Sequence, residues 1–379
     1  MGNLIGERVS TRRPGFAPVD LEKVPEVDAL LERLGLGPFD RESLVAPVGR
    51  NEVWAGDTAG GRKVFVKRLV GGGDDVRARM RRLLSFERFS AELSSSALRG
   101  PEFLGCDEEA RIVAFEYLED ARSGAELMVD ETFDDALAHA VGGAIGLLHA
   151  SPVRNPGDLD GSAPELPSPA LLQAIPERMF DNLSFGELQT WRLMQGDPAL
   201  IAAVTDLRAR EVKASPVPAH CDLRVDQLLV TDDAFYVADW EEFRLADPAR
   251  DVGGFAGEWL YRSILDIATS RGDTVFVDAD LTHDSVLRRG AEKIERLRPR
   301  IRNFWEGYCG SVGRADAERV ELAVRATAFA GWHLLDRMIA GSPQRGRISG
   351  IERAAAGIGR GILLNPERFA VTLGLGETA

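Results

Sequence analysis

A chain of 379 residues is long for one compact domain and suits a protein built of two lobes. Hydrophobic residues make up 44% of it and charged residues 28%, which is typical of globular proteins and leaves no apolar run long enough to span a membrane. The net charge of −14 argues against a nucleic-acid partner, because the chain would repel phosphates.

The chain begins with a polar, basic arm, residues 1–20, that lacks the apolar centre of a secretion signal. We therefore expect a cytoplasmic location. The leucines that follow fall on one helical face, which predicts a helix over residues 27–34, ended by glycines. The arm and this covering helix form the first expected segment, residues 1–39.

Residues 45–55 predict two strands joined by a tight turn, the arrangement with which kinases cover nucleotide phosphates. Gly49 is the single glycine of the usual glycine-rich turn, so an ordinary hairpin is the alternative. Residues 62–69 predict the next strand, with Lys67 on the face opposite its two valines. Lys67 matches the strand lysine that contacts nucleotide phosphates in kinases, the alternative being a surface lysine.

A helix predicted over residues 74–93 carries Glu87, the expected ion-pair partner of Lys67, with Glu92 as the alternative. Strands near residues 102–106 and 111–118 then complete a five-stranded antiparallel sheet.

The segment that ends this region is similar to a kinase hinge, where adenine is recognised by the backbone. The carbonyl of Glu116 and the amide of Leu118 are the expected contacts. Residues 40–117 are thus predicted to form a nucleotide-binding N-lobe. Residues 118–379 are predicted to form a C-lobe that carries catalysis and substrate binding.

The C-lobe is predicted to open with a core helix over residues 130–149. His149, at its end, is assigned no chemistry. A loop rich in proline and glycine follows over residues 151–168, and two helices are expected over residues 169–211.

The motif that begins at His220 contains the residues that kinase catalysis requires: an H-x-D, an amide side chain, a short apolar run and a second Asp. Asp222 is the predicted base for the acceptor hydroxyl, and Gln227 and Asp239 are the predicted Mg²⁺ ligands. The β-rich runs between them predict a hairpin that brings these residues to one site. A hairpin with polar ends is the alternative.

Arg224 lies two residues after Asp222, where a cation would neutralise charge on the transferring phosphoryl group. The alternative is a salt bridge to Asp226 or Asp247. Asp247 is followed by proline and predicts a helix start. We expect a structural role for both Asp247 and Asp251.

The rest of the chain is predicted to be helical, and its aromatic residues and His333 are assigned to the core. The expected helices cover residues 254–270, 283–308, 314–341 and 350–363.

The motif around Asp222 and the Asp239-Trp240 step resemble the aminoglycoside phosphotransferase and choline kinase superfamily. This resemblance implies an α+β, two-lobed, protein-kinase-like fold: a small N-lobe with an antiparallel sheet plus a helix, and a large, mostly helical C-lobe. It also implies ATP and Mg²⁺ as cofactors, and a substrate pocket in the region of residues 169–211. The superfamily has Asn where this chain has Gln227, so Asp226 could assist or replace that residue.

Three segments carry a closer resemblance, to the kinase subunits of class V lanthipeptide synthetases. They are GPFDRESLVAPVGRNEVWAG, FLGCDEEARIVAFEYLEDARSGAELM and HCDLRVDQLL. The resemblance implies phosphorylation of Ser and Thr in a ribosomal precursor peptide, followed by phosphate elimination by a separate lyase. It also implies lyase and cyclase subunits of a lanthionine synthetase complex as partners.

Two other functions stay open. A small-molecule O-phosphotransferase of the aminoglycoside-antibiotic type is favoured by the acidic balance and by Glu241-Glu242 beside the metal Asp. An inactive pseudokinase scaffold is favoured by Gln227 and by the incomplete glycine turn.

Overall fold

The computed structural model describes residues 19–46, 50–93, 97–268, 283–344 and 347–376. The chain divides into two compact units, residues 1–80 with 101–119 and residues 81–100 with 120–379. Each unit has its own hydrophobic core. Gly49, predicted for the turn over the phosphates, lies outside the described residues.

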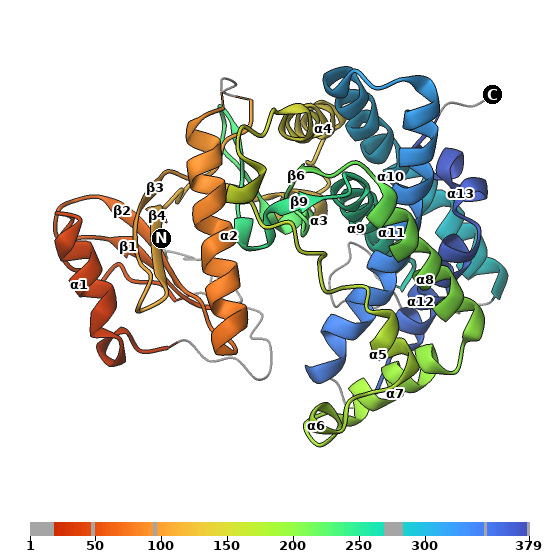
Figure 1. The fold of residues 1–379 in the computed structure, drawn as a ribbon, viewed down its shortest axis with the longest axis horizontal. Helices are drawn as coiled ribbons and strands as arrows, with labels where there is room; N and C mark the ends of the chain where they lie inside the picture. The colour runs from red at the N-terminus through yellow and green to blue at the C-terminus, as the bar shows by residue number, and fades with distance from the viewer. Residues whose placement is uncertain (1–18, 47–49, 94–96, 269–282, 345–346, 377–379) are drawn as a thin grey trace, which may run out of the picture. The chain divides into compact units, whose positions relative to one another are not determined.

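The first unit is an antiparallel sheet covered by helix α1, Pro25–Arg33 (Figure 1). The alternation predicted for β2 is confirmed, because Val64 and Val66 are fully buried and face Leu30 and Leu31 of α1 in one core. The strand order is β1-β2-β4-β3. The strands are β1 Glu52–Asp57, β2 Lys63–Arg68, β3 Phe103–Asp107 and β4 Ile112–Glu116.

The prediction of a five-stranded sheet is wrong for the described residues. Their sheet has four strands. The expected first strand is reduced to an isolated bridge between Val45 and Ala55. Two residues before Val45, the hydroxyl oxygen of Ser43 accepts a 3.0 Å hydrogen bond from the backbone amide of Asp57. A side-chain acceptor thus takes a backbone donor that a continued strand would have paired.

Helix α2, Gly73–Ala91, divides between the units after Met80. Within the second unit, Phe86 stacks on Trp240 with ring centroids 3.6 Å apart. Arg82 donates a 2.6 Å hydrogen bond to the carbonyl oxygen of Glu241. This half of α2 is therefore packed against the segment that follows the predicted catalytic hairpin.

The predicted hairpin is confirmed. Strands β7, Leu228–Val230, and β8, Phe235–Val237, pair antiparallel, with Leu228 opposite Val237. A short strand β5, Arg122–Ser123, adds to β7. A second pair lies in the same unit, β6 Val217–Ala219 with β9 Arg244–Ala246.

The two helices expected over residues 169–211 are four in the structure. Ser168, Ser184 and Asp197 each cap a helix through a side-chain oxygen, and each cap begins a new helix instead of continuing the last one. These helices are α5 Pro169–Gln173, α6 Glu177–Phe180, α7 Phe185–Gln195 and α8 Pro198–Lys213.

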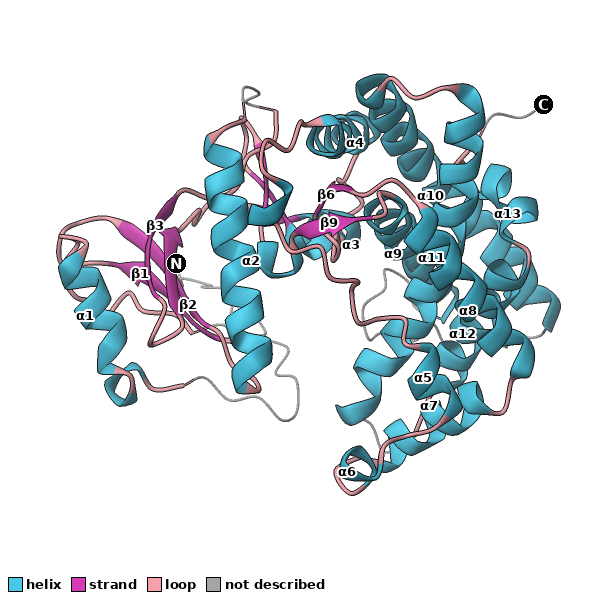
Figure 2. Cartoon of the chain, in the orientation of Figure 1, coloured by secondary structure: helices cyan, strands magenta, loops and turns pink. Residues whose placement is uncertain are grey.

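Helices make up most of the second unit (Figure 2). The predicted α+β class, with a small antiparallel sheet and a large helical part, is confirmed. No described helix is long and apolar enough to cross a membrane. The remaining helices are α3 Gly124–Val129, α4 Asp135–Ala150, α9 Ala249–Ala268, α10 His283–Val312, α11 Asp316–Gly341, α12 Gly350–Leu364 and α13 Pro366–Leu373.

Candidate active site

The loop between β6 and β7 is held in place by one buried carboxylate. Asp251, at the start of α9, accepts hydrogen bonds from the backbone amides of His220 and Cys221, both at 2.7 Å. Cys221 has a φ of 66°, a left-handed conformation that costs free energy outside glycine. The two charge-assisted hydrogen bonds offset that strain and fix the backbone immediately before Asp222.

Asp251 is in turn held by His149 of α4. The Nε2 atom of His149 lies 3.0 Å from Asp251 Oδ2, and its Nδ1 atom lies 3.0 Å from the hydroxyl of Tyr308 on α10. Burial alone would raise the pKa of Asp251, but the hydrogen bond and charge of His149 hold it below its ordinary value. The structural role predicted for Asp251 is confirmed, and His149, which was assigned no chemistry, supports Asp251.

Asp222 is the carboxylate that this loop presents. Its Oδ2 atom accepts a 3.2 Å hydrogen bond from Nε2 of Gln227, and Gln227 Oε1 accepts one from the Arg224 amide at 3.1 Å. The side chain keeps 43% of its surface exposed, yet enough protein surrounds it that desolvation raises the pKa of Asp222. The Asp239 carboxylate adds to this rise and Arg224 opposes it.

Arg224 lies alongside this carboxylate. Its Nε atom is 3.7 Å from Asp222 Oδ1 and 3.5 Å from Asp226 Oδ1. Burial would lower the pKa of Arg224, but the neighbouring carboxylates raise it, so the guanidinium stays charged. Of the predicted salt bridges, the one to Asp226 forms, whereas Asp247 pairs with Arg325 at 2.7 Å.

Asp239 follows β8 in a left-handed conformation, with a φ of 68°. The ring of His220 contacts the preceding carbonyl, Nε2 to Ala238 O at 3.0 Å, and packs on Trp240. The contacts of His220 therefore join the turn that carries Asp222 to the turn that carries Asp239. Asp239 is close enough to influence the pKa of Asp222.

The oxygen-rich side chains here fit a hard cation such as Mg²⁺. Among the described residues no group of three or more His, Cys, Asp or Glu side chains is arranged to hold a metal by itself. Kinases bind Mg²⁺ through one or two carboxylates together with phosphate oxygens, and Asp239 is a carboxylate that could take this role. The amide of Gln227 is instead directed at Arg224 and Asp222, so its predicted ligand role stays a prediction.

The predicted nucleotide contacts are divided between the units. Lys67 lies on β2, and Glu116 and Leu118 lie at the end of β4 and just beyond it, all in the first unit. Glu87 lies on α2 in the second unit, where burial raises its pKa to about 7. The predicted Lys67–Glu87 ion pair joins the two units and stays a prediction.

Sequence reasoning missed three polar side chains beside the catalytic loop. Glu258 on α9 accepts a 2.7 Å contact from Nε2 of His333 on α11, and Arg337 follows one helical turn later. Arg337 lowers the pKa of both Asp222 and Glu258, which places it among these carboxylates. The four-residue spacing of His333 and Arg337 was visible in the sequence, but nothing there named their partner.

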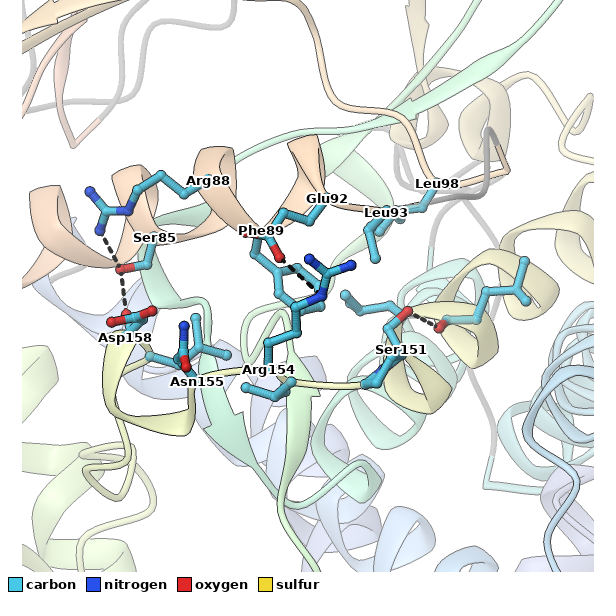
Figure 3. Close-up of a pocket in the computed structure, with 15 residues that line it drawn as sticks. Ser85, Arg88, Phe89, Glu92, Leu93, Leu98, Ser151, Arg154, Asn155 and Asp158 are labelled. Atoms are coloured by element: carbon cyan, nitrogen blue, oxygen red, sulfur yellow. Dashed lines mark hydrogen bonds and ion pairs between the residues drawn. The ribbon is translucent and has the colours of Figure 1, made fainter.

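The second unit also holds a cavity of about 320 Å³ between α2 and the loop after α4 (Figure 3). Arg154 reaches across it toward Glu92, at 3.8 Å, and Arg88 bonds Ser85 at one end. Of the residues considered for catalysis, metal or nucleotide binding, Glu92, the alternative partner of Lys67, lines this cavity.

Comparison with known proteins identifies the family. Residues 49–287 match the family described as the phosphotransferase enzyme family. No curated protein matches the chain. The amicoumacin kinase hAmiN, solved with AMP-PNP and Ca²⁺, aligns with 13% identity and a TM-score of 0.51 over 91% of this chain and 96% of its own. A putative fructosamine-3-kinase from Thermobifida fusca aligns with 15% identity and a TM-score of 0.50 over 92% and 99%.

These two structures share the kinase-like fold with this chain, so the fold predicted from the Asp222 motif is confirmed. The family match covers more than half of the chain and includes the whole catalytic loop. The chain belongs to the phosphotransferase enzyme family and is an ATP-dependent kinase that acts on a hydroxyl acceptor.

Proposed function

We propose that this kinase phosphorylates the hydroxyl group of a small molecule, with Asp222 as the base. The observation that carries the proposal is the held carboxylate of Asp222, fixed by Gln227 at 3.2 Å in a loop tied down by Asp251. A raised pKa suits a group that must take a proton from an alcohol near neutral pH, because it keeps its conjugate acid stable.

In the proposed reaction, Asp222 accepts the proton of the acceptor hydroxyl as that oxygen attacks the γ-phosphorus of ATP. The bond from the γ-phosphorus to the bridging oxygen breaks, and ADP leaves. Mg²⁺, when bound, neutralises phosphate charge, and Asp239 is the residue that would hold it. Arg224 adds a permanently charged guanidinium beside the base, which stabilises charge on the phosphoryl group.

The small-molecule acceptor is supported by the kinds of proteins that share the fold. The two aligned structures are named as kinases of amicoumacin and, putatively, of fructosamine. Glu241-Glu242, which had favoured a cationic antibiotic, does not support that class. Glu242 is ion-paired with Arg82 and Arg244, and Glu241 is buried. The acceptor is therefore left open to neutral and anionic alcohols.

The test is ADP formation by the purified chain with Mg·ATP and a panel of alcohols, with products identified by mass. A product heavier by one phosphate supports the proposal. Asp222→Asn should abolish that product and keep nucleotide binding. ADP formation that no alcohol stimulates, together with an unphosphorylated panel, would contradict it.

A second candidate acceptor is Ser or Thr in a ribosomal precursor peptide, as the lanthipeptide resemblance implies. The observation that favours it is Arg224 at 3.7 Å from Asp222, since protein Ser/Thr kinases carry a basic residue two positions after the base. A lyase and a cyclase would then be partners. One phosphate gained per modified Ser or Thr, and lost again when the lyase is added, supports this candidate. Phosphorylation of small alcohols with none on the peptide sinks it.

A further inference from the structure

Two helices build a charged surface beside the catalytic loop. Helices α9 and α11 lie side by side (Figure 1). A Cβ atom on Gly257 of α9 would meet His333 of α11 at 2.5 Å, and one on Gly254 would meet the Leu223 carbonyl oxygen at 2.7 Å. The glycines therefore let α9 pack tightly against both α11 and the residue that follows Asp222.

The charged surface, here called the α9–α11 wall, consists of Glu258, His333 and Arg337. Glu258 lies one turn after Gly254, on the side of α9 that contacts the catalytic loop. Arg337 lies one turn after His333, whose Nε2 atom is 2.7 Å from Glu258. This chain of contacts runs from the catalytic loop to Arg337, so the wall lies beside the loop that carries Asp222.

The carboxylates of this region already have partners. Glu258 is bound by His333, Asp336 accepts a 2.8 Å bond from Arg337 Nη2, and Asp226 faces Arg224. A cationic acceptor would therefore have to compete with an internal partner at each of these carboxylates. It would also meet two guanidinium groups of its own sign.

The two arginines, by contrast, are short of acceptor atoms. The Nε atoms of Arg224 and Arg337 are buried and have no hydrogen-bond partner among the described residues. The contacts from Arg224 Nε to carboxylates, 3.5 and 3.7 Å, are too long for hydrogen bonds. Each guanidinium carries five donors, so an oxyanion that brings several acceptor atoms suits this pair best.

We propose that Arg337, together with Arg224, binds an oxyanion group of the acceptor. The substrate is then an alcohol with a carboxylate or phosphate group close to the hydroxyl that is phosphorylated. This inference rests on the proposed function of Asp222, and it adds the substrate class and a specificity residue. The same chemistry could be supplied by the γ-phosphate of ATP, and the experiment separates the two sources.

The experiment measures kcat and KM by ADP release for acceptors matched except in charge. The pairs are D-glycerate with glycerol, and N-acetylserine with its amide, and choline serves as the cationic acceptor. The anionic member of each pair should have kcat/KM higher by about tenfold or more, as for one charge-assisted hydrogen bond. Arg337→Gln should remove that preference by raising KM for the anionic member and leave KM for ATP unchanged.

Two further variants distinguish a loss of oxyanion binding from a general loss of folding. Arg319→Gln changes a more exposed arginine of the same helix and should keep the preference. Arg337→Lys keeps the charge and loses the fork of donors, so it should retain part of the preference and the native melting temperature. The oxyanion is that of ATP, and the inference is wrong, if Arg337→Gln raises KM for ATP instead.

The inference is also overturned if neutral or cationic acceptors are preferred, or if no anionic acceptor is phosphorylated. Phosphorylation of glycerol or choline alone would leave the proposed function intact. That function fails separately if no alcohol is phosphorylated and Asp239→Asn leaves nucleotide binding unchanged.

Discussion

The Asp251 carboxylate accepts a 2.7 Å hydrogen bond from the amide of Cys221, a residue held in a left-handed conformation. This contact joins the first turn of α9 to the residue before the catalytic base. Because Asp251 also binds the His220 amide and His149, one buried side chain fixes the loop from several directions. The geometry at Asp222 therefore depends on a residue that is itself fully buried.

We expect Asp251→Asn to destabilise the second unit and to lower kcat more than it weakens ATP binding. An amide has one acceptor oxygen, so one of the two loop amides would face an NH₂ group, at a cost on the order of 2 kcal/mol. Denaturation midpoints and ADP release measure the two effects. Asp206→Asn, at an exposed position of α8, is the control. Unchanged turnover and stability would show that the loop is held by other contacts.

Gln227 gives a second prediction, because its two contacts distinguish positioning from metal binding. Gln227→Glu keeps an oxygen for the Arg224 amide but places a carboxylate against Asp222. Turnover should fall, and the Mg²⁺ concentration for half-maximal activity should not decrease. A titration of activity with Mg²⁺ measures both.

A metal-ligand role for Gln227 makes the opposite prediction. The added negative charge would then lower the Mg²⁺ requirement, and Gln227→Asn would retain more activity than Gln227→Leu. Equal activity of the Asn and Leu variants would assign the metal to Asp239 with other ligands.

Glu258 predicts how stability depends on pH. Burial would raise the pKa of Glu258, but His333, Arg337 and Arg224 lower it to about 2 from the ordinary 4.5. As pH falls, the Glu258 carboxylate is therefore protonated in the unfolded chain before it is protonated in the folded one. Its ionised form stabilises the folded protein above about pH 4.5, and this stabilisation is lost as pH falls toward 2. The shift corresponds to roughly 3 kcal/mol.

Urea denaturation midpoints of the wild type and Glu258→Gln, compared between neutral and acidic pH, test this. The wild type should be the more stable at pH 7, and the difference should shrink in acid. Glu318→Gln, an exposed glutamate of α11, should show no such difference. A gap that stayed constant with pH would mean that Glu258 is not ionised in the folded protein.

Local patterns were enough to predict much of the fold. The hairpin after Gln227, the alternation of β2 and the long C-terminal helices depend on neighbouring residues, and the structure has them. Failures arose where a side-chain oxygen replaced a backbone partner. The Ser43 hydroxyl accepts a hydrogen bond from the Asp57 amide where the first strand was expected, and the side chains of Ser184 and Asp197 cap new helices where two longer helices were expected.

The sequence was enough to identify the candidate catalytic residues, but not the side chains from distant segments that pack around them. Asp222 and Gln227 lie in one motif, so their proximity was predictable. Arg337 lies more than a hundred residues beyond that motif, and its charge acts on the pKa of Asp222 because α11 packs on α9 at Gly257. Contacts of this kind depend on tertiary packing, which no local spacing encodes.

If Asp222 is the base for transfer of the γ-phosphate from ATP to an alcohol, the product must carry that phosphate, and labelling detects it directly. Mg·ATP labelled at the γ-phosphate is incubated with the matched alcohols, and labelled product is counted for the wild type, Asp222→Asn and Asp232→Asn. Asp232, in the turn of the hairpin, is the control. We expect labelled alcohol with the wild type and the control, and a loss of about two to four orders of magnitude for Asp222→Asn with ATP binding intact. Equal labelling by Asp222→Asn, or no labelled alcohol with the wild type, would contradict it.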